Sequence, residues 1–295
     1  MSLQRKATII SSITAFILIM IKLIVGLASG AIVVLASAID SILDLVVSLF
    51  NYFAIRQAEK PSDELFNYGR GKVEALAGVF EGAIITLSGL FIIYASINKI
   101  VTGAPTQHLE MAVWVMGASM VITLALVLFL DYVARKTGNL VVQADALHYK
   151  SDLFSNTGIL ASLAVIWATG ADWLDPLIAI VIALYIIYSA YGIIKEGILM
   201  LMDRALDEEL VEEIKRVIMS ASPRIKSYHY LRTRRSGNTY IVDVHLVFDE
   251  SISLLEAHHA GDLIEERIKA LRNDAAWIVT IHLDPKDDSM MVSHP

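Results

Sequence analysis

The chain has 295 residues, of which 56% are hydrophobic and 19% are charged, and its mean hydropathy is +0.59. This is too apolar for a soluble domain of the same size, and the apolar residues occur in long runs, so we expect an integral membrane protein. The net charge of −7 argues against nucleic-acid binding, which needs a basic face. The sequence contains no cysteine, which excludes disulfides and thiolate metal sites.

Six apolar stretches are long enough to cross a bilayer. They cover residues 7–28, 31–54, 73–100, 109–133, 141–168 and 173–201. The first has a basic start and a small-residue end, as a cleaved signal peptide has. It is longer than a signal core and contains Lys22, which favours a retained first span.

The apolar content falls sharply after residue 203. We therefore expect a transmembrane domain over residues 1–203, a water-soluble domain over 204–288 and a loose tail over 289–295.

The positive charges predict how the chain is oriented. Lysine and arginine fall at the first, third and fifth flanks of the spans: Arg5, Lys6, Arg56, Lys60, Arg70, Lys72, Arg135 and Lys136. The alternate turns, residues 29–30, 102–108 and 169–172, carry neither. By the positive-inside rule, both termini and the soluble domain are expected to be cytoplasmic, in a multi-pass protein of the inner (cell) membrane.

Two pairs of ionisable residues lie inside these apolar stretches. Asp40 and Asp44 are four residues apart, as are His148 and Asp152, so each pair lies on one face of a helix, one turn apart. Charges at membrane depth are expensive and usually mark an ion or proton path. Three carboxylates and one imidazole suit tetrahedral Zn²⁺, and also Fe²⁺, Mn²⁺ or Cd²⁺. The alternative is that each residue is hydrogen-bonded separately in a polar seam.

Ligands must be deprotonated to bind a metal, so metal and protons compete at such a site, and this competition can couple the two in antiport. Other charged residues in the spans also need partners or water. Glu74 and Asp131 are near span ends and are expected to reach the interface, whereas Glu81 and Lys22 lie deeper. Lys22 is interpreted as a snorkelling or helix-pairing cation.

The soluble part shows a regular order of elements. The patterns predict, in order, a helix over 207–221, strands over 225–234 and 239–249 joined by a turn at 236–238, a helix over 253–271 and a strand over 277–284. This α-β-β-α-β order is typical of a small α+β sandwich. The expected fold class is thus an α-helical membrane bundle of six transmembrane helices followed by a small α+β cytoplasmic domain.

Five of the eight histidines fall in the soluble domain. His282 and Asp284 share one face of a strand, and His245 lies on the neighbouring strand. His229 falls on the other arm of the hairpin, and His258 or His259 on the second helix. As a group with Asp284 they indicate metal binding, and the domain is a candidate cytoplasmic metal sensor.

Enzyme motifs do not occur. The sequence has no His-Glu-x-x-His, no Gly-x-Gly-Asp and no Gly-x-Ser-x-Gly segment, and no Gly-rich phosphate loop. We therefore predict that the protein is not an enzyme, binds no ATP and uses an ion gradient.

Six spans, Asp-x-x-x-Asp in the second, His-x-x-x-Asp in the fifth and an α-β-β-α-β domain resemble the cation diffusion facilitator family over essentially the whole chain. The segments 143–152, 231–235 and 281–285 are similar to those of its bacterial zinc and iron efflux members. The resemblance implies a homodimeric metal/proton antiporter that exports metal by alternating access. It implies Asp40, Asp44, His148 and Asp152 as the ligands of the transported Zn²⁺, with Fe²⁺ and Cd²⁺ as alternative substrates.

The resemblance also implies a cytoplasmic Zn²⁺ site with structural or regulatory roles. Its ligand positions are matched by His229, His245, His258, His282 and Asp284. Lys72 and Asp203 match a charged pair that serves such transporters as a hinge between the domains.

One part of the resemblance is broken. Relatives take a further zinc site from one Asp and two His in the second loop, and the aligned positions here are Asp63, Phe66 and Arg70. Only the aspartate is present, which predicts that the loop site is absent.

Two functions from different classes remain. The first is the exporter, with divalent metal ions, protons, the lipid bilayer and a second copy of the chain as partners, and with no organic cofactor, nucleic acid or ATP. The second is a membrane-anchored metal sensor or scaffold that binds metal without moving it. A sensor needs only the soluble histidine cluster, whereas the exporter needs the intramembrane residues.

Overall fold

The computed structural model describes residues 2–29, 32–102, 110–169, 174–273 and 275–287. Within these ranges some side chains, including that of Asp40, are also outside the description. The predicted tail, residues 289–295, lies outside the described residues. The chain forms two compact units, Met1–Ile198 and Leu199–Pro295, which are described separately.

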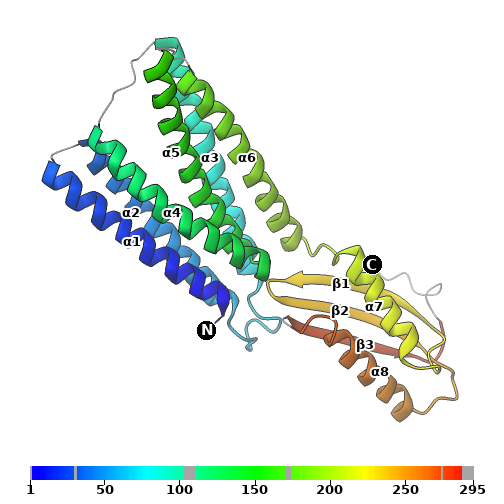
Figure 1. Ribbon diagram of the computed structural model, residues 1–295. Helices are drawn as coiled ribbons and strands as arrows, with labels where there is room; N and C mark the ends of the chain where they lie inside the picture. The colour runs from blue at the N-terminus through cyan, green and yellow to red at the C-terminus, as the bar shows by residue number, and fades with distance from the viewer. Residues whose placement is uncertain (1, 30–31, 103–109, 170–173, 274, 288–295) are drawn as a thin grey trace. The chain divides into compact units, whose positions relative to one another are not determined.

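The first unit is built from six long helices (Figure 1). They are α1 (Leu3–Ser29), α2 (Ile32–Ala58), α3 (Lys72–Thr102), α4 (Glu110–Thr137), α5 (Leu140–Thr169) and α6 (Leu174–Leu201). A bilayer interior offers no hydrogen-bond partners, so a spanning segment must pair its backbone groups within itself, as a helix does. The expected fold class, six helices followed by a small α+β domain, is confirmed.

Four of these helices have described segments that are long and apolar enough to cross a membrane: Leu3–Val25, Lys72–Thr102, Gly117–Thr137 and Pro176–Leu201. Their outward side chains are large and apolar, for example Phe16, Leu87 and Tyr188, which are 55%, 66% and 77% exposed. Such exposure suits contact with lipid rather than with water.

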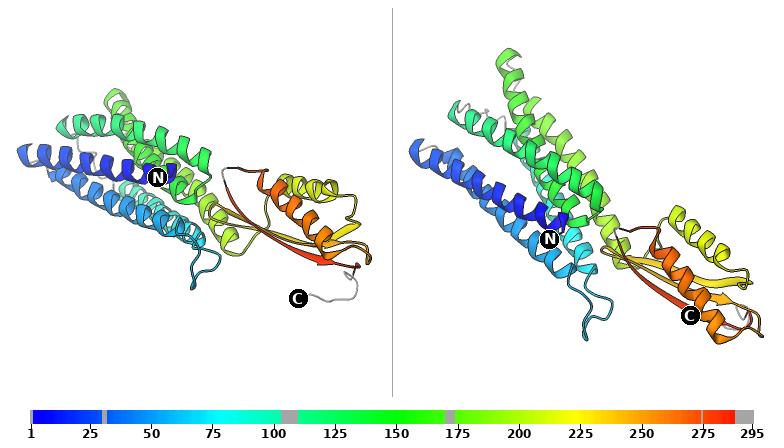
Figure 2. Two further views of the ribbon diagram at one scale, coloured as in Figure 1. Left: turned by 90° about the horizontal axis from the view of Figure 1, so that it is seen from below. Right: turned by 60° about the horizontal axis from the view of Figure 1, so that its bottom comes forward.

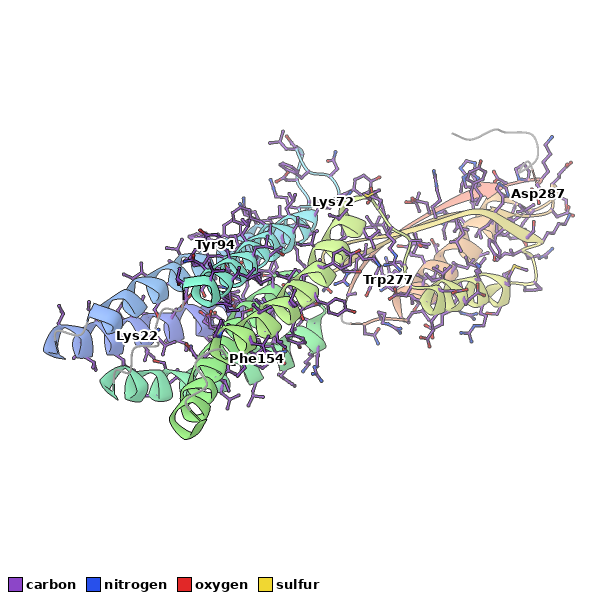
Figure 3. All side chains as sticks on the ribbon, turned by 90° about the horizontal axis from the view of Figure 1, so that it is seen from above. Lys22, Lys72, Tyr94, Phe154, Trp277 and Asp287 are labelled. Carbon is purple, nitrogen blue, oxygen red and sulfur yellow. The ribbon has the colours of Figure 1, made fainter. Side chains whose placement is uncertain are left out.

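Small apolar residues fill the interior, where five helices meet around Ala7, Ile55, Ala77, Leu130 and Val142. The sixth helix packs on α3 through glycines. A Cβ atom at Gly89 would lie 2.7 Å from Cγ1 of Ile187, so only glycine permits this approach. Phe154 of α5, labelled in Figure 3, contacts Tyr185 of α6 edge to face at 5.7 Å between ring centroids.

The start of α5 is fixed by capping contacts. Gly138 has a φ of 58° and its N–H donates to the carbonyl of Ala134 at 2.8 Å, which ends α4. Asn139 Oδ1 then accepts from the N–H of Val142 at 3.1 Å, and Glu74 Oε1 accepts from the N–H of Leu140 at 2.8 Å. The first N–H groups of a helix have no partner within it, so these contacts determine where α5 begins.

The expectation that Glu74 reaches the membrane interface is therefore wrong. Its side chain is buried, because it serves the first turn of α5 rather than water. Lys22 donates to Ser41 Oγ at 2.8 Å, which joins α1 to α2 and agrees with the helix-pairing interpretation. Lys150 and Asp131 form an ion pair between α5 and α4.

The second unit contains a three-stranded sheet and two helices. Its elements are α7 (Glu208–Ala221), β1 (Ser227–Ser236), β2 (Thr239–Val247), α8 (Leu254–Lys269) and β3 (Ala276–Asp284). The strand order is β1-β2-β3, with β1 antiparallel and β3 parallel to β2. The predicted α-β-β-α-β order is confirmed, and β1 runs two residues further than predicted because the turn contains only Gly237, with φ 59°, and Asn238.

Both helices of this unit pack on one face of the sheet (Figure 2). The core on that face contains Ile214 and Ile218 of α7, Ile264 and Ile268 of α8, and Val242, Val244 and Leu246 of β2. Side chains alternate along a strand, so His245 points to the opposite face. Helix α8 begins with a capping box between Ser253 and Glu256.

Replacing Ile264 by Ala should destabilise this unit by roughly 2–5 kcal/mol, because the side chain is completely buried in the sheet–helix core. The control is Leu254→Ala on the same helix, which is 78% exposed and should cost less than about 0.5 kcal/mol. Urea unfolding of the full chain in detergent, followed by fluorescence, measures both. Equal midpoints for the two variants would contradict the assigned core.

Candidate metal sites

Three of the four predicted intramembrane ligands lie together between α2 and α5. His148 Nε2 is 3.1 Å from Asp44 Oδ1 and 3.8 Å from Asp152 Oδ2. One ligand atom from each of the three residues lies within 4.8 Å of the others. The four-residue spacing on α5 places His148 and Asp152 on one face, which is turned toward Asp44.

These separations suit a divalent cation. Zn²⁺ binds nitrogen and oxygen at about 2.0–2.2 Å, which places tetrahedral ligand atoms about 3.4 Å apart. The observed 3.1 and 3.8 Å lie on either side of this value. Asp40 is one turn before Asp44 on α2, but its side chain is outside the described residues, so its role as a ligand stays a prediction.

A polar network that sequence reasoning missed surrounds these residues. Ser48 Oγ lies 2.9 Å from Ser11 Oγ and 3.0 Å from the hydroxyl of Tyr149. Asn51 Nδ2 donates to Asp145 Oδ1 at 3.3 Å. Single neutral polar residues in an apolar span carry little signal. The spacing of Ser41, Asp44, Ser48 and Asn51 by three and four residues, which makes one polar stripe on α2, is the signal that could have revealed the network.

A second group lies on the open face of the soluble sheet. The carboxylate of Asp284 is 3.0 Å from His245 Nδ1, 3.3 Å from His229 Nε2 and 3.0 Å from His282 Nε2. Strand register produces this arrangement, because His229 is paired with His245 and His245 with His282 across the three strands. Ligand atoms of His229, His245 and Asp284 all lie within 4.8 Å of one another.

A β-bulge in β1 contributes to this group and was not predicted. The register shifts by one residue between His229 and Arg232, and Tyr230 adopts a φ of 54°. The extra residue lets Tyr228 and Leu231 both pack against the helices, although they are three residues apart. Without the bulge, strict alternation along the strand would place Tyr228 and Leu231 on opposite faces. With the bulge, both face the helices while His229 stays on the same face as His245.

His258 lies apart from this group within one chain, so its role as a ligand of the five-residue set stays a prediction. It lies on α8, which covers the opposite face of the sheet, and its side chain is 67% exposed. Its Nδ1 is 3.1 Å from Asp262 Oδ1 one turn later on the same helix. Sequence reasoning placed the histidine on the correct helix but could not tell which sheet face that helix covers.

Side chains of the second loop contact one another closely. Arg70 Nη2 forms an ion pair with Asp63 Oδ2 at 2.5 Å, and its guanidinium carbon is 4.2 Å from the ring centroid of Phe66. Asp63 Oδ1 accepts from the N–H groups of Leu65 and Phe66 at 3.0 and 2.9 Å. Both carboxylate oxygens are therefore occupied, and the two residues that stand where relatives have histidines stack on each other. These contacts support the prediction that the loop holds no metal.

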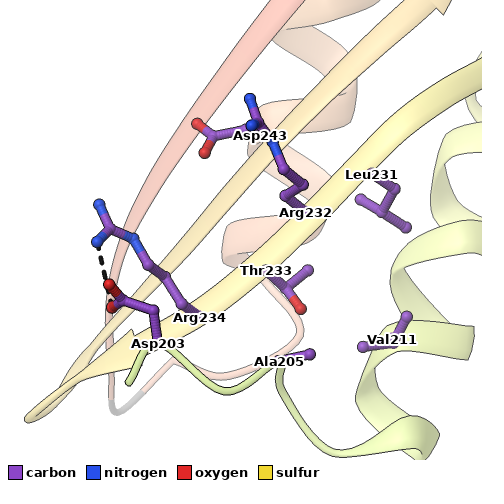
Figure 4. Close-up of a pocket in the computed structure, with 8 residues that line it drawn as sticks. All are labelled: Asp203, Ala205, Val211, Leu231, Arg232, Thr233, Arg234 and Asp243. Carbon is purple, nitrogen blue, oxygen red and sulfur yellow. Dashed lines mark hydrogen bonds and ion pairs between the residues drawn. The ribbon is translucent and has the colours of Figure 1, made fainter. Parts of the chain in front are cut away.

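Asp203 lies at the edge of a pocket of about 580 Å³ within the second unit (Figure 4). Its Oδ1 accepts from Arg234 Nη1 at 3.2 Å, and Arg232, Thr233 and Asp243 line the same pocket. The hinge role of Lys72 and Asp203, which belong to different units, stays a prediction.

The two parts of the chain match two family models. Residues 8–202 match the cation efflux transmembrane domain, and residues 206–286 match the cytoplasmic domain of cation efflux proteins. The chain belongs to the cation diffusion facilitator family. It is 40% identical over 272 residues to the cation-efflux pump FieF of Shewanella oneidensis, covering 92% of this chain and 90% of the relative. The FieF pumps of Klebsiella pneumoniae and Escherichia coli are 37% and 35% identical over 283 residues, covering 96% of this chain and 93% of each relative.

Asp63→Asn should loosen the loop without changing the number of bound metals. The Arg70 guanidinium and the Phe66 N–H hold the pKa of Asp63 below its ordinary value. These contacts of Asp63 therefore stabilise the folded loop. The stabilisation is fully present above the ordinary aspartate pKa of about 3.9 and is lost as the pH falls through the lowered pKa. At neutral pH the variant should be cleaved faster by trypsin at residues 60–70, with unchanged zinc in equilibrium dialysis. Loss of one zinc per chain would show that the loop holds a metal after all.

His245→Ala together with His282→Ala should lower the zinc bound by the full chain and weaken its dimer, since two nitrogen ligands beside Asp284 are lost. The matched control is His259→Ala, an exposed histidine on α8. Calorimetric zinc titration and analytical ultracentrifugation in detergent measure the two effects. If the double variant binds as much zinc as the control, these residues do not form a zinc site.

Proposed function

We propose that the protein is a proton-coupled divalent metal antiporter that exports Zn²⁺ from the cytoplasm, with Fe²⁺ and Cd²⁺ as alternative substrates. The observation that carries this proposal is the convergence of Asp44, His148 and Asp152 from two different helices inside the helical unit. Membership of the cation efflux family, and the chain's similarity to cation-efflux pumps, support export as the direction of transport.

The chemistry of the three residues favours a transported cation over a structural one. Their side chains are 17%, 18% and 42% exposed, so the group is neither sealed nor freely hydrated. The carboxylates supply negative charge where hydration is reduced, and the imidazole supplies a nitrogen ligand that suits Zn²⁺. Because the same atoms bind either metal or protons, loading one expels the other, and this exchange is the basis of antiport.

Alternating access is supported by the origin of the ligands. Asp44 comes from α2, whereas His148 and Asp152 come from α5. The proposed motion changes the surroundings of α2 and α5 so that the group opens first to the cytoplasm and then to the other side. Asp40, as the proposed fourth ligand, belongs to the same helix as Asp44.

We assign the soluble unit to dimerisation and metal sensing in the cytoplasm. The match of residues 206–286 to the cytoplasmic domain of cation efflux proteins supports a homodimer. The group of His229, His245, His282 and Asp284 is the proposed Zn²⁺ site of this unit, and it does not conduct metal. Both termini are placed in the cytoplasm and the helical unit in the inner membrane, on the distribution of positive charge.

A metal sensor or scaffold remains the alternative from a different class. It needs only the group on the soluble sheet and leaves the intramembrane group without a role. Proteoliposomes that contain the purified protein and a metal-reporting dye separate the two functions. Export predicts that the dye signal rises after Zn²⁺ is added and that the pH of the liposome lumen changes at the same time. A sensor predicts that the dye signal rises no faster than in empty liposomes.

Asp152→Asn should abolish metal flux in these proteoliposomes while leaving the protein folded, because it removes a charge but little volume from the ligand group. Glu64→Gln, an equally conservative change on the exposed second loop, is the control and should transport at the wild-type rate. Flux by pure, folded Asp152→Asn protein at the control rate would exclude this group as the transport site.

A further inference from the structure

Beside the proposed transport group lies a set of buried oxygen atoms that lack hydrogen-bond donors. Both carboxylate oxygens of Glu81, Oδ2 of Asp145 and Oδ1 of Asn51 are fully buried and have no hydrogen-bond partner among the described residues. Glu81 is 1% exposed and Asp145 is not exposed. These atoms come from α3, α5 and α2, so the set lies where three helices meet.

Almost all buried polar atoms in proteins are hydrogen-bonded, and a buried ionised carboxylate without partners is strongly unfavourable. The groups that act most strongly on the Glu81 carboxylate are Asp145, His148 and Asn51. Asp145 carries the same charge when ionised, so it cannot act as a counter-ion for Glu81. The unpaired atoms are all acceptors. The Asn51 amide is directed at both carboxyl groups and donates to Asp145, so it cannot satisfy all of these atoms, and the set is short of hydrogen donors.

The surroundings supply few charges of either sign. The titratable and polar groups that face the pair are Ser11 of α1, Asp44 and Asn51 of α2, and His148 and Tyr149 of α5. Helix α6 meets α3 here with apolar side chains, at Gly82 through Ile194 and at Gly89 through Ile187.

We propose that Glu81 and Asp145 form a proton-binding carboxyl pair, separate from the metal ligands, that carries a proton exchanged for the transported metal. This inference rests on the proposed antiport and names a further residue pair for it. A proton on one carboxyl supplies the missing donor and removes one of the two like charges, as in carboxyl pairs that share a proton. A proton occupies almost no volume, so it can bind here although the helices are closely packed.

The position of the pair gives it a way to respond to metal. Asp145 lies three residues before His148 on α5, and therefore on a neighbouring part of the same helix surface. Glu81 acts electrostatically on His148. A divalent cation held by Asp44, His148 and Asp152 therefore favours the ionised form of the pair and expels its proton, and a proton that returns weakens the hold on the metal.

Infrared spectroscopy of the purified full chain tests the protonation directly. At neutral pH without metal, the wild-type protein should show the carbonyl stretching band of a protonated carboxyl group, and saturating Zn²⁺ should reduce it. Glu81→Gln should lose this band, and Glu81→Asp, which keeps an acid at the position, should retain it. Wild-type protein without such a band, or a band unchanged in both Glu81→Gln and Asp145→Asn, overturns the proposal.

Metal binding and proton transport are then measured on the same variants. Glu81→Gln should bind as many Zn²⁺ ions per chain as wild type in equilibrium dialysis, but should move fewer protons per metal in proteoliposomes and lose the stimulation of flux by a pH gradient. Glu64→Gln should match wild type in both measurements. A Glu81→Gln protein that binds one metal fewer would show that the pair is a metal site, and one with the wild-type proton ratio would show that it carries no coupled proton.

These outcomes separate this inference from the proposed function. If wild-type protein moves no metal, the antiport fails whatever the infrared band shows. If wild-type protein exchanges metal for protons and Glu81→Gln does so equally, only the role of the carboxyl pair fails.

Discussion

The interior of a bilayer contains no water to solvate charge, and this constraint shapes the helical unit. A charged residue at the centre of a membrane helix costs roughly 2.5–3.5 kcal/mol of free energy on insertion scales. We therefore expect each one to make an interaction that offsets this cost. Lys22 bonds to Ser41, Lys150 pairs with Asp131, and Glu74 caps the first turn of α5. Two adjoining places among the described residues hold further charged groups without such a structural use, the group of Asp44, His148 and Asp152 and the pair of Glu81 and Asp145.

In the second unit, the helices pack on only one face of the sheet. The other face is left free to carry polar ligands. Parallel pairing of β3 with β2 places His282 beside His245, and antiparallel pairing of β1 places His229 on the other side of it. Asp284 ends β3 next to all three imidazoles. A carboxylate among three imidazoles is an arrangement that gains from a bound cation, so this face suits a metal-dependent contact between subunits.

In the second loop, side-chain contacts stand at the positions that match a zinc site in relatives. A zinc ion would link an aspartate and two histidines, whereas here Arg70 links Asp63 to Phe66 by an ion pair and a cation–π contact. The loop is thus held in shape whether or not zinc is present. Surface ion pairs are individually weak, so this loop depends less on a single strong bond than a zinc-bound loop does.

The sequence by itself determined the number of spans, the order of the soluble elements and the identity of most candidate ligands. These follow from local rules: apolar length predicts spans, a four-residue spacing predicts a shared helix face, and alternation predicts strands. Tertiary structure decided which charged residues meet. Glu74 and Glu81 look alike in sequence, seven residues apart on one helix, yet one caps α5 and the other is left without a donor. Within one chain, His258 lies on the helix-covered side of the sheet, away from the other histidines, and a one-residue bulge in β1 set the place of His229. Contacts between distant segments depend on register and on which face an element covers, and no local pattern contains either.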